Sequence, residues 1–266
     1  MIARLRSHVL KRLAHFLLRS GTFRRHMGTL DANLNPRFVR LASLLRGASD
    51  AEAVFVRDLV AGVVPEVHLW VVLESRGKTG GYFVEFGATD GVDISSTYLL
   101  ERDLGWRGIL AEPNPVWHEA LRRNRKAAID TRCVFRTTGA RVDFAATRAP
   151  ALATIAEFVG CDGHARSRAE HRVIEVETVS LDDLLDAHGA PRDIDFISID
   201  TEGSELAILE RFDFAKWNVR LFSIEHNMTG QERAIDALMR ANGYERRYPV
   251  CSPIDAWYRK KAPDAG

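Results

Sequence analysis

Acidic residues stand at the ends of several apolar runs in this 266-residue chain. Glu112 follows "GILA", Asp200 follows "DFISI" and Glu225 follows "LFSI", while Glu85 lies inside "YFVEF". A carboxylate next to a buried strand needs a partner, because an isolated buried charge is costly. Carboxylates in such positions accept ligand hydroxyls, exchange protons or bind cations. These four residues are therefore the first candidates for a binding or catalytic site.

The elements that must position these acids follow from an alternation of two patterns after residue 80. Short runs rich in Ile, Val and Phe read as buried parallel strands: "YFVEFG", "GILAEP", "RCVF", "DFISID" and "RLFSIEH". Stretches suited to crossover helices lie between them, at residues 93–104, 115–125, 180–189 and 204–213. This alternation predicts an α/β fold with a doubly wound, mostly parallel, Rossmann-like sheet. The carboxyl ends of its strands meet at one edge, so the acids should gather there.

Two further stretches depart from this rhythm. "RVDFA" and "RVIEVETV", within residues 139–178, alternate like edge strands, and the polar loop between them is expected to cover a site. "NGYERRYPV" and "DAWYRK" are expected to close the chain as a pair of terminal strands.

The turn "EFGATDG" differs from a dinucleotide-binding turn, which would read G-x-G-x-x-G. Its glycines are only Gly87 and Gly91, and Glu85 and Asp90 make its surroundings negative, which would repel a pyrophosphate and suit a cationic ligand. Glu112 comes 21 positions after Gly91, where a carboxylate accepts both ribose hydroxyls. A cationic, ribose-bearing cofactor without phosphate is S-adenosylmethionine. The alternative is a tight strand–helix turn that binds no ligand.

Five motifs, in this order, resemble the FkbM family of S-adenosylmethionine-dependent methyltransferases: "GYFVEFGATDG", "GWRGILAEPNPVWHEAL", "VETVSLDDLL", "IDFISIDTEGSELAIL" and "FSIEHN". The resemblance covers roughly residues 78–250, and "IDTEGSE" is its most specific part. It implies a class I methyltransferase fold over residues 77–262. Residues 1–76 lie outside the resemblance, and their own helix signals predict an N-terminal helical extension. The resemblance also implies O-methylation of a hydroxyl on a sugar, glycolipid or related natural-product acceptor.

The resemblance also assigns cofactor-binding roles. The first motif would surround the methionine part, with glycines that let the backbone approach it, and the next helix start would reach the methionine carboxylate. Glu112 would bind the ribose, its two successors would line the adenine side, and residues 136–138 would contact the adenine amino group. The cofactor-binding residues implied in this way are Glu85, Gly87, Ala88, Asp90, Gly91, Ser95, Ser96, Glu112, Pro113 and Asn114.

His226 is the first candidate for the general base, because the unperturbed pKa of histidine lies near neutral pH. Asp200 and Glu225 would orient that base or the acceptor hydroxyl, or would together hold a divalent cation such as Mg²⁺. The sequence contains no dedicated metal-binding motif, so these roles stay open. His226 also has a purely structural alternative, in a hydrogen-bond network at the strand end.

The net charge and the cysteine content limit the kinds of partner and compartment that the chain suits. A net charge of +1 argues against a general nucleic-acid binder, and three scattered cysteines suit a reducing cytoplasm. Residues 1–27 form a basic amphipathic pattern, expected to pack on a protein surface or to lie on the anionic inner face of a membrane. The expected substrate is a small-molecule or glycan acceptor. A competing interpretation is a catalytically silent domain that binds a membrane or a protein, and the oligomeric state stays open.

Overall fold

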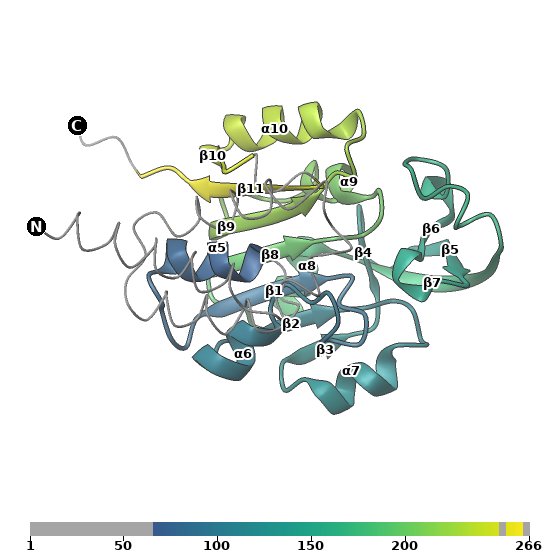
Figure 1. The fold of residues 1–266 in the computed structure, drawn as a ribbon, viewed down its shortest axis with the longest axis horizontal. Helices are drawn as coiled ribbons and strands as arrows, with labels where there is room; N and C mark the ends of the chain where they lie inside the picture. The colour runs from purple at the N-terminus through teal and green to yellow at the C-terminus, as the bar shows by residue number, and fades with distance from the viewer. Residues whose placement is uncertain (1–65, 250–253, 263–266) are drawn as a thin grey trace, which may run out of the picture. The chain divides into compact units, whose positions relative to one another are not determined.

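The computed structural model describes residues 66–249 and 254–262 (Figure 1). The strands are β1 (Tyr82–Phe86), β2 (Arg107–Ala111), β3 (Ala128–Asp130), β4 (Cys133–Phe135), β5 (Arg141–Thr147), β6 (Thr154–Ile155), β7 (His171–Ser180), β8 (Asp193–Ile199), β9 (Asn218–Glu225), β10 (Tyr244–Arg247) and β11 (Asp255–Lys260). The helices are α5 (Glu66–Ser75), α6 (Tyr98–Leu104), α7 (His118–Asn124), α8 (Leu181–Ala187), α9 (Glu205–Leu209) and α10 (Gln231–Ala241), with the 3₁₀ turns η1 (Pro150–Leu152) and η2 (Ala156–Phe158).

Seven strands form the main sheet, in the order β10-β11-β9-β8-β1-β2-β3. Strands β1, β2, β3, β8 and β9 are parallel, whereas β11 runs antiparallel to both β9 and β10. The chain starts in the middle at β1, winds outward through β2 and β3, and returns to β8 on the other side. This is a doubly wound sheet, and its switch point lies between β1 and β8. The expected α/β fold and the antiparallel terminal pair are confirmed.

Alternation along the strands gives both faces of the sheet an apolar layer. Val84 and Phe86 of β1 belong to the core that α8, α9 and α10 cover, together with Ile197 of β8. On the opposite face, Trp70 of α5 stacks on Trp257 of β11, with ring centroids 5.2 Å apart. Helices therefore cover both faces, as the continuous apolar strands require.

The third strand of the main sheet is not the one expected from the sequence. "RCVF" was expected to continue the parallel sheet, but β3 at Ala128–Asp130 occupies that edge. Residues Cys133–Phe135 instead form β4 of a separate sheet, in the order β4-β7-β5-β6. The sequence does not predict a strand at "AID", because three residues are too few to show a periodic pattern. The strands expected at "RVDFA" and "RVIEVETV" are found in this second sheet as β5 and β7, which pair antiparallel.

Helix α5 belongs with the sheet. Trp70 and Val71 of this helix are fully buried, and Trp70 also meets Phe196 of β8 edge-on at 6.2 Å. A boundary at residue 76 would separate this helix from the strands that it covers, so the compact domain includes it. The basic segment 1–27 and the rest of residues 1–65 lie outside the described residues.

Candidate active site

A cleft lies at the carboxyl ends of β1, β2 and β8, which is the ligand-binding edge of a doubly wound sheet. Residues from the second sheet and from the segment 148–170, here called the insertion, form its opposite wall. The lining residues are Phe86, Gly87, Thr89, Ile94, Ala111, Glu112, Pro113, Cys133, Val134, Phe144, Pro150, Ala151, Ala153, Ile155, Asp200, Thr201, Glu202 and Ser204. Most are apolar or small, and the acids are few, which is the usual character of a small-molecule site.

Glu112 projects into this cleft from the end of β2. The Thr89 backbone N–H donates to its Oε2 at 2.9 Å, and the Asn114 N–H donates to its Oε1 at 2.8 Å. These two donors fix the carboxylate while each oxygen keeps a further lone pair for a ligand hydroxyl. Burial raises the pKa of Glu112 to about 7, because desolvation outweighs the two backbone hydrogen bonds. The position is the one expected for a ribose-binding acid.

Glu85 is used differently from the sequence-based expectation. Its carboxylate accepts hydrogen bonds from the Ser95 hydroxyl at 2.9 Å, the Ser96 N–H at 2.6 Å and the Thr97 hydroxyl. The buried Arg125 guanidinium lies 3.7 Å from the same carboxylate. Arg125 thus supplies the positive charge that we expected from a ligand, and Glu85 anchors the loop before α6. For the same reason the helix begins at Tyr98 rather than near residue 93.

The two glycines of the first motif are required by the protein itself. At Gly87, with φ +72°, a Cβ atom would lie 1.9 Å from the carbonyl oxygen of Asp200. At Gly91, with φ +80°, a Cβ would lie 2.5 Å from Cγ of Arg125. At Gly87 the backbone thus lies close to the end of the neighbouring strand β8, whereas the sequence suggested that it lies close to a ligand. Gly87 still lines the cleft, so its backbone is accessible there.

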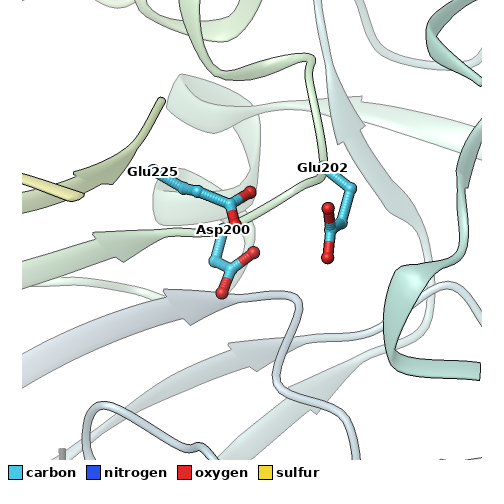
Figure 2. A group of neighbouring side chains, drawn as sticks. All are labelled: Asp200, Glu202 and Glu225. Atoms are coloured by element: carbon cyan, nitrogen blue, oxygen red, sulfur yellow. The ribbon is translucent and has the colours of Figure 1, made fainter. Parts of the chain in front are cut away.

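Three further carboxyl groups lie close together at the ends of β8 and β9, on the opposite side of β1 from Glu112. Asp200 follows β8, Glu202 lies on the turn to α9, and Glu225 ends β9 (Figure 2). One oxygen atom from each lies within 4.8 Å of the others. We call Asp200, Glu202 and Glu225 the carboxylate cluster. It confirms that the strand-end acids of β8 and β9 meet, and it adds Glu202, which is not among the residues predicted for the site.

Burial and mutual repulsion raise the pKa of each acid in the cluster. The pKa of Asp200 rises well above its usual range, chiefly by burial and then by the charge of Glu202. The pKa of Glu225 also rises strongly, by burial and by the charge of Asp200. Burial raises the pKa of Glu202 to about 7. The cluster therefore holds protons near neutral pH unless a cation offsets its charge.

His226 directly follows β9, and its ring lies beside residues of α10 and β10. The Met228 N–H donates to its Nδ1 at 3.1 Å, and its Nε2 lies 3.3 Å from the Arg246 guanidinium and 3.9 Å from Glu232. Burial lowers its pKa. His226 does not line the cleft, so its position does not support a role as general base.

Asp200 and the predicted cofactor-binding residues divide into two groups. Those that line the cleft are Gly87, Glu112, Pro113 and Asp200. Those that shape its surroundings without lining it are Glu85, Ala88, Asp90, Gly91, Ser95, Ser96 and Asn114, and Asp90 does so by accepting the Val92 and Asp93 N–H groups. Val134 and Phe144 line the cleft, whereas Arg136, one of the residues expected to contact the adenine amino group, is exposed and paired with Glu157.

In the described part of the chain, no helix is both long and apolar enough to cross a membrane.

Solved structures of methyltransferases show distant similarity to this chain. The precorrin-6y C5,15-methyltransferase from Geobacter metallireducens GS-15 is 12% identical, with 68% of this chain and 72% of that chain covered and a TM-score of 0.38. The human methyltransferase 10 domain containing protein is 10% identical, with 84% and 94% covered and a TM-score of 0.33. Because this likeness is weak, the fold assignment rests on the sheet topology.

The sequence model of the methyltransferase FkbM domain matches residues 85–246. That span contains Glu112, the carboxylate cluster and the whole insertion. None of the curated proteins compared with the chain matches it. Because the matched span exceeds half of the chain and the sheet has the expected topology, this chain belongs to the FkbM methyltransferase family.

Proposed function

We propose that this methyltransferase takes its methyl group from S-adenosylmethionine and transfers it to a hydroxyl of a sugar, glycolipid or related natural product. The proposal is carried by one observation: a single cleft contains the buried acid Glu112 after β2 and acids of the carboxylate cluster after β8. Strand β1 separates the two positions in the sheet. They suit the two ends of one extended ligand.

The residues present fit this cofactor. The oriented oxygens of Glu112 suit two ribose hydroxyls, and the apolar Pro113, Val134 and Phe144 beside it suit a flat base. On the other side of β1, the acids Asp200 and Glu202 suit a sulfonium, because an opposite charge offsets the cost of their burial. When bound, the cofactor supplies an already activated methyl group.

The chain's own task is then to align an acceptor hydroxyl and to receive its proton. Asp200 is the acid best placed for this task, since it lines the cleft and its pKa is raised toward that of a useful base. A carboxylate oxygen of Glu225 lies within 4.8 Å of one of Asp200, so Glu225 is placed to orient that base. A carboxylate base favours a hydroxyl acceptor, because the hydroxyl can donate a hydrogen bond to the carboxylate before methyl transfer.

A divalent cation such as Mg²⁺ is part of the proposal. The cluster offers three carboxylates, and hard cations of this kind prefer oxygen ligands. Such a cation would draw the carboxylates into their ionised forms and would bind the acceptor oxygen.

Calorimetric titration with S-adenosylmethionine tests the cofactor assignment. Wild type should bind it, and Glu112→Ala should weaken binding by about tenfold to a hundredfold, because hydrogen bonds to a charged group are lost. Glu119→Ala is the matched control, since that glutamate is almost fully exposed on α7. Wild-type protein that fails to bind the cofactor would overturn the proposal.

A screen of hydroxylated sugars and glycolipids with methyl-labelled cofactor tests the reaction. Asp200→Asn should lose far more turnover, about a hundredfold or more, than cofactor affinity, because the base is removed while Glu202 still faces the sulfonium. Equal turnover in wild type and Asp200→Asn would exclude this acid as the base.

A further inference from the structure

The buried Arg168 joins the insertion to the strand edge. It is fully buried, and its guanidinium pairs with Asp162 of the insertion through two contacts of 2.8 and 3.0 Å. The same guanidinium donates to Oε2 of Glu202, across the cleft wall, and its Nε donates to the Leu152 carbonyl at 2.9 Å. One side chain therefore ties two parts of the insertion to the turn between β8 and α9.

Glu202 is shared between this link and the carboxylate cluster. Its carboxylate pairs with Arg168 on one side and lies within 4.8 Å of the Asp200 and Glu225 oxygens on the other. The residue has φ +60°, an uncommon conformation for a residue other than glycine, Asn or Asp. Asn227 Nδ2 lies 3.4 Å from the same Glu202 oxygen. The backbone thus holds Glu202 between the Arg168 guanidinium and the other two acids of the carboxylate cluster.

A separate observation, a buried carboxylate oxygen without a partner, points to a ligand in the cluster. Glu225 is 8% exposed, and its Oε2 is buried without a hydrogen-bond partner. A buried carboxylate oxygen of this kind is costly unless a ligand or a cation becomes its partner. The unpartnered oxygen belongs to one of the three carboxyl groups that lie within ligand distance of a common cation.

From these contacts we propose that Arg168 is a tethered counter-cation that closes the insertion over the cleft, and that a divalent cation entering the carboxylate cluster displaces it from Glu202 and loosens the insertion. The inference rests on the cation site of the proposed function. The physical reason is repulsion: a guanidinium and a divalent cation on one carboxylate face each other in a site of low dielectric. The two cations therefore compete for Glu202. The hydrogen-exchange protection of the insertion should differ according to which of them is bound there.

The test uses the full chain and Mn²⁺ as the probe. Calorimetry measures Mn²⁺ affinity, and hydrogen exchange measures the protection of residues 148–170 with and without the ion. Arg168→Met should bind Mn²⁺ about tenfold more tightly than wild type, because the competing charge is gone. Mn²⁺ should lower the protection of the insertion in wild type and leave it unchanged in Arg168→Met.

Arg148→Met is the matched control, because that arginine lies in the same insertion but forms an exposed pair with Glu170. It should behave as wild type in both measurements. The double variant Asp162→Asn with Arg168→Met removes one charge of each sign, and it keeps the test valid if the single variant folds poorly. It should also bind Mn²⁺ more tightly than wild type.

Unchanged or weaker Mn²⁺ binding by both Arg168 variants would overturn the inference. Mn²⁺ binding to wild type with an equally or better protected insertion would do the same. The titration with S-adenosylmethionine is independent of these results, so failure of the tethered counter-cation can be told apart from failure of the proposed function.

Discussion

At the scale of single residues, the chemical role of each acid depends on which partner reaches it. Glu85 and Glu112 both accompany parallel strands, and both are buried. Glu85 meets Arg125 and three donors from residues 95–97, whereas Glu112 meets two backbone N–H groups and the open cleft. Of these two acids, only Glu112 keeps hydrogen-bonding capacity for a ligand, so it is the candidate for direct contact with the cofactor.

The raised pKa of Glu112 predicts a pH-dependent stability. In the folded protein its pKa is about 7, above the ordinary value of 4.5, so the folded state binds a proton that the unfolded state releases. Its stabilising contribution is present below pH 4.5 and is lost as the pH rises through 7. Between pH 5 and pH 8, the stability of wild type relative to Glu112→Ala should therefore fall by roughly 2 kcal/mol.

Urea denaturation of the two proteins at several pH values, without cofactor, measures this difference. Glu119→Ala supplies the control, since its exposed side chain should leave the pH slope of wild type unaltered. Parallel pH profiles for wild type and Glu112→Ala would show that Glu112 ionises normally in the folded state.

At the scale of elements, helix α5 is a structural part of the domain although it lies before the first strand. Trp70 fills the space between Trp257 of β11 and Phe196 of β8. Replacing it with alanine should destabilise the protein by about 3–5 kcal/mol, as expected for deletion of a large buried aromatic side chain.

The midpoint of urea denaturation measures this loss. Trp117→Ala is the matched control, because Trp117 is only partly buried and precedes α7 at the surface. It should cost clearly less than Trp70→Ala. Equal stability of wild type and Trp70→Ala would mean that α5 does not contribute to the core.

The insertion is the element that the sequence described least well. Its flanking strands β5 and β7 could be recognised by alternation, and a covering role was expected for the loop between them. The pairing of Arg168 with Glu202 could not be recognised, because the partners are 34 residues apart and neither sits in a periodic pattern. The same limit explains why "RCVF" was assigned to the main sheet.

At the scale of the whole molecule, the basic N-terminal segment lies outside the described residues, and its role stays a prediction from the sequence. Residues 1–27 carry seven Lys and Arg residues and no acidic residue. Each such charge contributes about 1 kcal/mol near an anionic surface. Deleting residues 1–27 should therefore abolish most cosedimentation of the protein with anionic vesicles, while neutral vesicles serve as the control. Equal cosedimentation of both forms would remove the membrane interpretation.

The sequence by itself determined the fold class, the order of the main helices and strands, and the family, because hydrophobic periodicity and strand-end motifs are local properties. It also placed Glu112 and Asp200 correctly at the ligand-binding edge. Only the tertiary structure decided which residues face the cleft: it placed His226 beside Arg246, matched Glu85 with Arg125, and brought Glu202 into the carboxylate cluster. These outcomes depend on strand register and on contacts between distant parts of the chain, which no local pattern encodes.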